Sequence, residues 1–463
     1  MIHIIGGGLA GCEAAWQSTL LGVPVTLHEM RPQRPTAVHK TDRLAELVCS
    51  NSFRGDKLDN AVGLLKEEMR NLNSLIMRAA DVSRVPAGTA LAVDREHFAQ
   101  VITEAIEGHP LITLLREEVL RVPKVRPLII ATGPLTTGAF FQEISTLIGG
   151  KQLYFYDAIS PIVLADTINQ SRVFRASRWN KNSQPQMIEN GETVNSLASS
   201  TTAVSCGVDD GQGDYLNCPL TKEEYDLFYD ALIKAESATV HDFDKEIFFE
   251  GCLPIEVMAH RGRDTLRFGP MKPVGLIDPH TGLKPYAVVQ LRQDNLAGDH
   301  YSLVGFQTQL KWSEQARILK MIPGLESVEF VRLGMVHRNT YINGPTVLRE
   351  TWQMKEFPDL FFAGQISGVE GYVESAASGL VAGRNAAGLV LGQAPCTLPR
   401  ETAIGALSYY VANAEAQNYQ PTNITFGILP PLSKAPRRRQ ERKMALSARA
   451  LAALNEWQAM ANT

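Results

Sequence analysis

Residues 1–15 read MIHIIGGGLAGCEAA, and this stretch decides the fold. An apolar run at residues 2–5 passes directly into the pattern G-x-G-x-x-G, and helix-forming residues follow at once. Strand, tight turn and helix in immediate succession are the context that a dinucleotide-binding fingerprint requires. We expect Gly6 to permit the turn, Gly8 to let a pyrophosphate approach the backbone, and Gly11 to let helix and strand pack closely. The N–H groups and the positive dipole of the helix N-terminus then face the phosphates.

A second apolar run, residues 23–27, ends in His28 and Glu29. Glu29 lies 18 positions after Gly11, a spacing that suits a carboxylate accepting hydrogen bonds from both ribose hydroxyls. The alternative is a glycine-rich turn in an ordinary α/β domain, which the second strand and its carboxylate disfavour. The predicted nucleotide contacts in this half are Gly6, Gly7, Gly8, Leu9, Ala10, Gly11 and Glu29.

Two later stretches resemble the parts that close a flavin site. The strand-like run 127–133 ends in Ala131, Thr132 and Gly133, whose small side chains allow close backbone approach. The run 359–365 also ends in a small-residue turn, and a Gly/Ala-rich helix is expected at 374–391. Either piece alone also fits an ordinary strand end or an Ala-rich core helix. Together they predict a second backbone nest for FAD, with the contacts Gly364, Gln365, Gly371 and Tyr372.

The composition is that of a globular enzyme of two to three domains. The chain has 463 residues, of which 44% are hydrophobic and 20% charged. The net charge of −4 gives no bulk attraction to nucleic acid, so RNA binding needs a local basic patch. No apolar run reaches about 18 residues, and the first strand leaves no room for a signal peptide, so we expect a cytoplasmic protein without a membrane span. The six cysteines are scattered without a CxxC pair, which predicts reduced thiols and no metal site.

The sequence predicts an α/β fold in which a Rossmann-like FAD-binding domain of the glutathione-reductase type carries an inserted α+β substrate domain. We expect residues 1–150 and 336–463 to form the first and residues 151–335 the second, with a polar extended loop at 171–213. Smaller expectations concern local elements. They are one amphipathic helix over 60–78, a small crossover sheet from 111–115 and 119–122, and a capping box from Thr221 to Glu224.

Two cysteines are candidates for chemistry. Cys252 lies in the turn 248–256, flanked by the carboxylates of Glu250 and Glu256 and the rigid Pro254, and Cys49 lies in the small polar segment 47–52. Nearby arginines favour thiolate at either position, although a cysteine is more often a small buried hydrophobe. The arginines near Cys252 are Arg261, Arg263 and Arg267. A basic segment, Arg437, Arg438 and Arg439 with Lys443, is either an RNA contact or a solvated helix face.

Several motifs together resemble one family, the folate- and FAD-dependent tRNA (uracil-54-C5)-methyltransferases, which are related to larger wobble-uridine-modifying flavoproteins. The matching segments are IIGGGLAGCEAA (4–15), HEMRP (28–32), LVCSNS (47–52), FEGCLPIE (249–256), RFGPMKPVGL (267–276), GQISGVEGY (364–372) and NITFG (423–427). They span nearly the whole chain, and the cysteine, Arg-Phe-Gly-Pro and Gly-Gln motifs are far more specific than the glycine fingerprint.

The resemblance implies a reaction. Family members pass a methylene from 5,10-methylenetetrahydrofolate through reduced flavin to C5 of a tRNA uracil, and NADH or NADPH supplies electrons. Cys252 matches the cysteine that adds to C6 of the uracil, and Cys49 matches a second, flavin-proximal cysteine. Tyr372 is expected to stack on the flavin or pterin ring. The general base that removes the C5 proton is not identified by the sequence. The two arginine groups, Arg261–Arg267 and Arg437–Lys443, are the candidate RNA surfaces.

Three alternatives stay open at this stage. The scaffold also suits a ribosomal-RNA uridine C5-methylase, or a wobble-uridine-modifying flavoprotein. The third alternative is a flavin-bearing RNA-binding protein without catalysis, which has no need of Cys252 in so specific a turn.

Overall fold

The computed structural model describes residues 1–36, 38–136, 138–150, 152–178, 213–238 and 253–461. Within these residues the fold centres on a five-stranded sheet in the order β16-β7-β1-β2-β6, and every pairing in it is parallel. Its strands are β1 (Ile2–Ile5), β2 (Val25–Glu29), β6 (Ile112–Arg116), β7 (Leu128–Ile130) and β16 (Leu360–Phe362). The predicted Rossmann-like α/β fold is confirmed. Both glycine-lined segments therefore leave the same edge of one sheet, because parallel strands end together.

Two helices pack face to face beside this sheet. They are α1 (Leu9–Leu20) and α11 (Tyr372–Val390). A Cβ atom on Gly379 would lie 2.1 Å from the Ala10 carbonyl oxygen, and one on Gly383 would lie 2.4 Å from that of Ala14. The small residues of α11 thus let its backbone approach that of α1.

The single helix expected over 60–78 is wrong: the chain forms α2 (Ala61–Asn71) and α3 (Leu75–Val82). Asn73 takes a left-handed conformation with φ of 56°, and the Ser74 hydroxyl accepts a hydrogen bond from Met77 N at 3.2 Å. Asparagine tolerates that conformation and serine is a strong N-cap, so this pair ends one helix and starts the next. Helical spacing of apolar residues across the break concealed both signals.

The small crossover sheet expected at 111–122 is also wrong. β6 lies at the edge of the main sheet beside β2, and residues 119–122 form no strand. The separate small sheet is built instead from β3 (Ser52–Gly55), β5 (Ala90–Val93) and β4 (Arg84–Val85). Two further helices of this half are α4 (Arg95–Glu107), which follows β5, and α5 (Gly138–Leu147), which follows β7.

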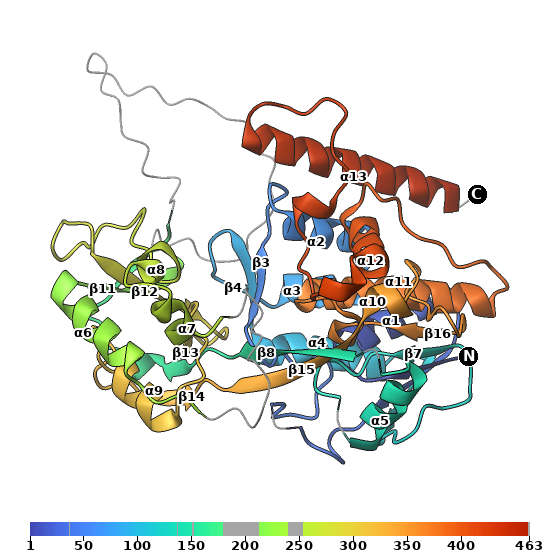
Figure 1. Ribbon diagram of the computed structural model, residues 1–463, viewed down its shortest axis with the longest axis horizontal. Helices are drawn as coiled ribbons and strands as arrows, with labels where there is room; N and C mark the ends of the chain where they lie inside the picture. Colours follow the sequence, from blue (N-terminus) through green and yellow to red (C-terminus); the bar gives the residue numbers. More distant parts are fainter. Residues whose placement is uncertain (37, 137, 151, 179–212, 239–252, 462–463) are drawn as a thin grey trace.

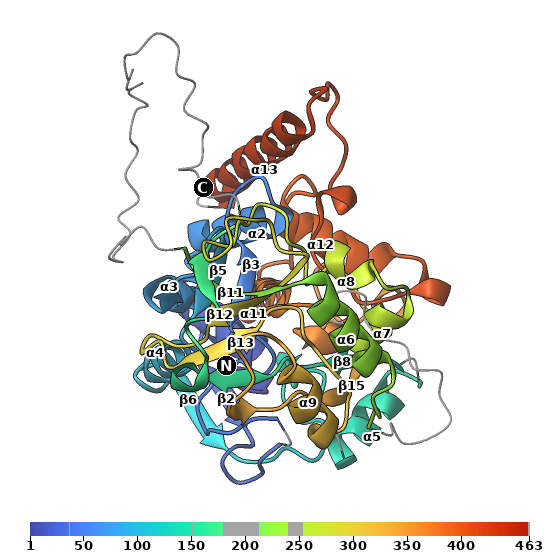
Figure 2. The same ribbon diagram turned by 90° about the vertical axis from the view of Figure 1, so that its left-hand side faces the viewer.

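A six-stranded antiparallel sheet, in the order β10-β11-β12-β13-β9-β14, forms the other half of the molecule, on the left in Figure 1. Its strands are β9 (Ile162–Leu164), β10 (Phe174–Ala176), β11 (Tyr215–Leu220), β12 (Ala287–Gln293), β13 (His300–Leu303) and β14 (Phe330–Arg332). The helices here are α6 (Lys222–Ile233), α7 (Ile255–His260), α8 (Thr265–Phe268) and α9 (Trp312–Leu319), after the short η1 (Ala165–Thr167). Figure 2 shows α6 and α9 in front of this sheet.

The capping box is confirmed, since the Thr221 hydroxyl accepts from Glu224 N and the Glu224 carboxylate accepts from Thr221 N. The extended loop expected at 171–213 is partly wrong. β10 lies inside this range and pairs with β11, which begins just after it. Phe174 and Val173 are buried, and these apolar residues give the segment a sheet partner despite its polar surroundings. Residues 179–212 lie outside the described part of the chain.

Two long strands, β8 (Gln152–Ala158) and β15 (Val336–Ile342), pair antiparallel and run between the two halves (Figure 1). The remaining elements are α10 (Gly344–Val347), η3 (Gln365–Ser367), α12 (Ala403–Asn413), η4 (Ala416–Asn418), η5 (Phe426–Ile428) and α13 (Arg439–Ala461). α13 packs on α2, where Ser447 donates a hydrogen bond to the Leu58 carbonyl at 2.6 Å. Among the helices of the described residues, none is both long and apolar enough to cross a membrane.

Candidate cofactor and substrate cavities

A cavity opens at the carboxyl ends of the parallel strands, and we call it the first cavity. Its wall combines the loop after β1, the end of β2, the end of β7 and the turn after β16. The predicted contacts that line it are Gly6, Gly7, Gly8, Leu9, Ala10, Glu29, Ala131, Thr132, Gly133, Gly364, Gln365 and Tyr372. The structure therefore brings together two segments that lie more than 200 positions apart in the chain. Gly11 lies beneath the cavity and does not line it.

The glycines of the first turn have different duties. Gly6 has φ of 107°, and a Cβ on Gly11 would lie 1.8 Å from the Gly6 carbonyl oxygen, so both are required by the fold itself. A Cβ on Gly8, by contrast, would meet no atom within 4 Å. The space above Gly8 is open beside the N-terminus of α1, which is where a fingerprint glycine leaves room for a pyrophosphate. These residues fit a dinucleotide.

Glu29 ends β2 as predicted and is buried at the rim of the first cavity. One carboxylate oxygen accepts from Gly7 N at 2.9 Å, and the other accepts from Arg31 N at 3.0 Å and Nε at 2.8 Å. Burial alone raises the pKa of Glu29, but the hydrogen bonds and charge of Arg31 outweigh it and leave the pKa below its usual value. An ionised carboxylate has about four acceptor positions, so it retains one for a ribose hydroxyl.

A second cavity adjoins the first and reaches the six-stranded sheet. The residues common to both walls are Val48, Pro134, Leu135, Gln365 and Tyr372. Its own wall adds Cys49, Ser50, Arg54 and Gly371 from the parallel-sheet half, and Arg292, Ser302 and Gln307 from the other half. A ligand that extends along the first cavity therefore ends where side chains from both halves meet.

Tyr372 holds the Cys49 segment in place. Its hydroxyl oxygen accepts from Cys49 N at 2.9 Å and Ser50 N at 3.1 Å, and its ring lies 5.7 Å from that of Phe53. Burial raises the pKa of Tyr372, so the hydroxyl stays protonated near neutral pH. The tyrosine lines both cavities, as the expected ring stacking requires, but its hydroxyl has a structural duty that the sequence did not indicate.

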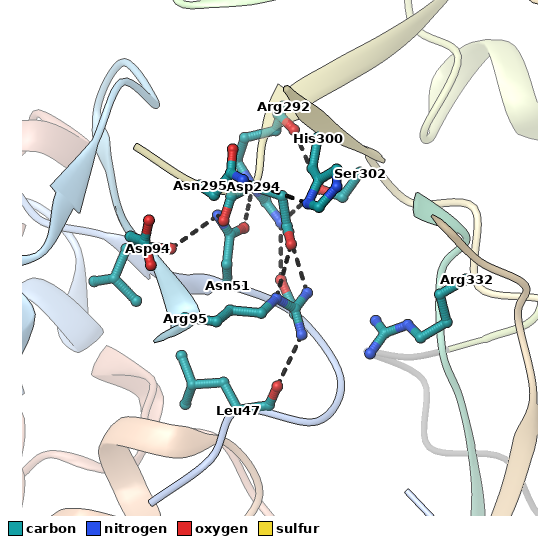
Figure 3. A network of polar contacts seen from close by, with 12 residues as sticks. Leu47, Asn51, Asp94, Arg95, Arg292, Asp294, Asn295, His300, Ser302 and Arg332 are labelled. Atoms are coloured by element: carbon teal, nitrogen blue, oxygen red, sulfur yellow. Dashed lines mark hydrogen bonds and ion pairs between the residues drawn. The ribbon is translucent and has the colours of Figure 1, made fainter. Parts of the chain in front are cut away.

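Three arginines bind residues 47–51, the segment that contains Cys49, and Figure 3 shows them with Leu47 and Asn51. Arg95 of α4 donates to the carbonyls of Leu47 at 2.8 Å and Cys49 at 3.4 Å. Arg332 of β14 donates to those of Val48 at 2.9 Å and Cys49 at 3.0 Å. Arg292 of β12 donates to Asn51 Oδ1 at 2.8 Å and Ser50 Oγ at 2.9 Å. This segment of the parallel-sheet half is thus bound by side chains from the six-stranded sheet.

Sequence reasoning missed these three arginines and their carboxylate, Asp294. They lie in separate strands and helices, and no motif links them in the chain. A weak signal existed: Arg292 directly follows the mostly apolar run 287–291, and a charged residue at the end of a buried strand needs a polar partner.

The other predicted residues have mixed outcomes. Cys252 lies outside the described residues, and nothing in the structure tests it. Arg263 is paired with Asp226 and Asp230, and Arg267 with Asp264, so both already have acidic partners. Arg437, Arg438 and Arg439 are exposed at the start of α13. Cys12 is buried in α1, and burial raises the pKa of its thiol, as is usual for a structural cysteine. Within the described residues, no His, Cys, Asp and Glu groups are placed to bind a metal ion.

Comparisons with known proteins agree with this arrangement. The family model for glucose inhibited division protein A matches residues 1–205 and 193–394. A structure of Aquifex aeolicus GidA is similar at 17% identity with a TM-score of 0.65, covering 98% of this chain and 73% of that one, which shows the fold.

Curated relatives are similar over their whole length. The methylenetetrahydrofolate–tRNA-(uracil-5-)-methyltransferase TrmFO of Heliobacterium modesticaldum is 56% identical, over 99% of this chain and 98% of its own. The protein of the same name from Bacillus velezensis is 53% identical, over 97% of each. The fold, the two joined cavities and these relatives agree, and the chain belongs to the TrmFO family of tRNA (uracil-5-)-methyltransferases.

Proposed function

We propose that this protein methylates C5 of uridine 54 in tRNA, with 5,10-methylenetetrahydrofolate as carbon donor, FAD as carrier and NADH or NADPH as reductant. Membership of the family supports the reaction. The observation that carries the proposal is that the two cavities adjoin, with Gln365 and Tyr372 in the walls of both. A dinucleotide held in the first cavity then presents its reactive end to a second cavity bordered by Cys49.

In this proposal the first cavity holds FAD. Gly8 and the free N–H groups at the start of α1 bind the pyrophosphate, and Glu29 binds the adenosine ribose. Ala131–Gly133 and Gly364–Gln365 provide backbone contacts toward the flavin end, next to Gly371 at the N-terminus of α11. FAD, when bound, supplies a redox-active ring that carries the one-carbon unit from folate to uracil.

Cys252 is the proposed nucleophile. Uracil C5 is a poor nucleophile until a thiolate adds at C6, because the addition converts the ring into an enolate with electron density at C5. The chain that follows Cys252 is held beside the second cavity: Ile255 N donates to the Gln307 carbonyl at 2.7 Å, and Gln307 lines that cavity. The Glu256 carboxylate also accepts from Gln309 N at 2.6 Å. Cys49, on the opposite wall, is the proposed assisting or protecting thiol.

The halves of the molecule have separate tasks in this proposal. Residues 1–150 and 336–463 form the FAD domain, and residues 151–335 form the inserted domain that admits the RNA. The exposed Arg437, Arg438 and Arg439 are the stronger candidates for phosphate contact. Arg263 and Arg267 are paired with aspartates, whereas in the first group the structure pairs Arg438 with Glu441 at 3.4 Å and gives no ion pair for the described Arg437 and Arg439. Arg261 stays in the candidate set. The cytoplasm is the proposed location.

Mass spectrometry of nucleosides tests the proposal. A strain lacking its own enzyme is complemented with the wild-type chain, Cys252→Ala or Cys396→Ala, the last being an exposed cysteine that serves as control. We expect 5-methyluridine at position 54 of tRNA with the wild type and the control, and none with Cys252→Ala, although that protein stays yellow. A methyl group found only in ribosomal RNA, or a changed wobble uridine, would transfer the proposal to the corresponding alternative. No RNA change with a yellow protein would favour a non-catalytic binder.

A further inference from the structure

Arg292, in the wall of the second cavity, has no carboxylate partner. Its Nε donates to Asn51 Oδ1 at 2.8 Å, and its Nη2 donates to the hydroxyls of Ser50 at 2.9 Å and Ser302 at 3.4 Å. All three acceptors are neutral. No ion pair to Arg292 is present within the described residues, and the side chain is only 9% exposed. The guanidinium is therefore a buried positive charge that the described chain solvates but does not neutralise.

The neighbouring charges do not supply the missing anion. Asp294 is engaged by Arg95 on both oxygens, at 3.0 and 3.2 Å. Arg332 binds the neutral carbonyls of Val48 and Cys49, and its Nε is buried without a partner in the described structure. Burial lowers the pKa of Arg332 to about 10 and also lowers that of Arg292, and an arginine stays protonated at neutral pH. Figure 3 shows these three arginines with two aspartates, Asp294 and Asp94, and Asp94 accepts from the backbone N–H groups of His97 and Leu296. The group therefore keeps an excess of positive charge.

This excess is directed at the ligand space. Arg292 lines the second cavity together with Ser50 and Ser302, and its Nη1 has no acceptor among the described residues. Burying an unneutralised charge is costly, so a site that keeps one beside a cavity is arranged for an anion that arrives from outside. The two hydroxyls fix the orientation of the guanidinium before that anion binds.

We propose that Arg292 binds a planar oxyanion of the substrates in the second cavity. This inference rests on the proposed function, which brings two such groups. One is a glutamate carboxylate of the folate. The other is the oxygen at C4 of the uracil, which gains the electron pair of the C5=C6 bond when a thiolate bonds to C6 and loses it again when C5 forms its new bond. The two N–H groups of Arg292 Nη1 have no acceptor among the described residues, and a charged N–H donor suits either oxygen.

The folate source is tested by calorimetry on the FAD-loaded protein, with 5-formyltetrahydrofolate and, as a probe without carboxylates, 6-methyltetrahydropterin. If the carboxylate binds Arg292, Arg292→Met lowers the affinity for 5-formyltetrahydrofolate by about 10- to 100-fold. The affinity for 6-methyltetrahydropterin falls by less than about 2-fold. Arg292→Lys retains part of the affinity. The control is Arg175→Met, which removes an arginine of the same sheet that donates to the Tyr301 hydroxyl and lines neither cavity.

The uracil source is tested by the single-turnover rate of methyl transfer to tRNA. If the C4 oxygen binds Arg292, both probes bind Arg292→Met normally, but the rate falls by about the same 10- to 100-fold. Normal probe affinities together with a normal rate would overturn the proposal. So would a parallel loss of FAD and of thermal stability that Arg292→Lys does not restore. A wild-type protein that methylates no tRNA, yet binds 5-formyltetrahydrofolate in an Arg292-dependent way, would refute the proposed function and leave this site standing.

Discussion

The two cavities are built from different materials. The first is lined mainly by backbone and small residues at the ends of parallel strands, and its glycines leave space or permit turns. The second is bordered by long polar side chains, of which Arg292 comes from the six-stranded sheet, Gln307 from the loop after β13 and Arg54 from the parallel-sheet half. The first cavity is thus formed by the strand ends of one parallel sheet, whereas the second is formed by residues from both halves of the molecule.

The two cavities should respond differently to amino-acid substitutions. A backbone cradle is fixed by the helix and strand that carry it, so it forms whether or not the second half is correctly placed. The second cavity depends on contacts across the junction, where Arg332 binds the carbonyls of Val48 and Cys49 and Arg95 pairs with Asp294. Substitutions in the first should therefore remove ligand from an intact protein, whereas substitutions at the junction should change stability and the Cys49 segment.

The largest effect is expected for Gly8→Val. A Cβ there meets no protein atom within 4 Å, so the chain should fold, with a melting temperature close to that of the flavin-free wild type. The branched side chain then occupies the space of the pyrophosphate, and we expect FAD affinity to fall by more than about 1,000-fold. Absorbance near 450 nm after purification measures the number of flavins per chain, which should be about one in the wild type.

Gly11→Val gives the matched contrast. Its Cβ would lie 1.8 Å from the Gly6 carbonyl oxygen, so this variant should lose stability before ligand is considered. A yellow, fully loaded Gly8→Val protein would contradict the assignment of the fingerprint, whatever happens at Gly11.

Arg95→Met tests the junction and ranks second. It leaves the buried carboxylate of Asp294 without its bidentate partner and releases the carbonyls of Leu47 and Cys49. Breaking a buried pair in this way costs about 3–5 kcal/mol, to be measured by urea unfolding of the loaded protein. Asp294→Asn and the double variant complete a cycle. Additive losses would show that the pair does not couple the two halves.

The parallel-sheet fold was predictable from the sequence because its signals are local. Residues 2–29 carry strand, turn, helix and strand in an unbroken run, and each element forms where its own periodicity places it. Failures occurred where one residue overrides a regular pattern. The left-handed Asn73 splits an apparently continuous helix, and buried Phe174 gives a polar segment a strand partner.

The site divides along the same line. Glu29, Gly8 and Gly364 were found because backbone cradles have a fixed spacing in sequence. Arg95, Arg292 and Arg332 were not found, since they come from three elements and acquire meaning only from the carbonyls and hydroxyls that they share in space. No repeating pattern in the sequence indicates that these three residues lie close together in space.

His39 provides a pH test of the first cavity. Burial, and then the charge of Arg31, lower the pKa of His39 to about 4 from an ordinary value of 6.5. The unfolded chain therefore binds more protons between these values, so the free energy of unfolding should fall by up to about 3 kcal/mol as pH drops from 6.5 to 4. Urea midpoints across this range measure it. His39→Gln should flatten the slope, whereas His109→Gln, on the edge of Trp16, should not. An equal slope in all three proteins would contradict the prediction.

The smallest effect is expected at the residue that the cavities share. Tyr372→Phe removes the oxygen that accepts from Cys49 N and Ser50 N, and leaves both N–H groups without that acceptor. The loss should be about 1–3 kcal/mol, with faster hydrogen exchange at those two amides, because an unmade buried hydrogen bond costs that much. Flavin content should stay unchanged, since the backbone cradle is untouched. Tyr229→Phe removes a comparable hydroxyl, which donates to the Ala259 carbonyl at 2.9 Å, and should leave exchange around Cys49 as it was. If Tyr372→Phe released flavin without affecting the Cys49 amides, the tyrosine would belong to the cofactor cradle, and the division between the two cavities would have to be redrawn.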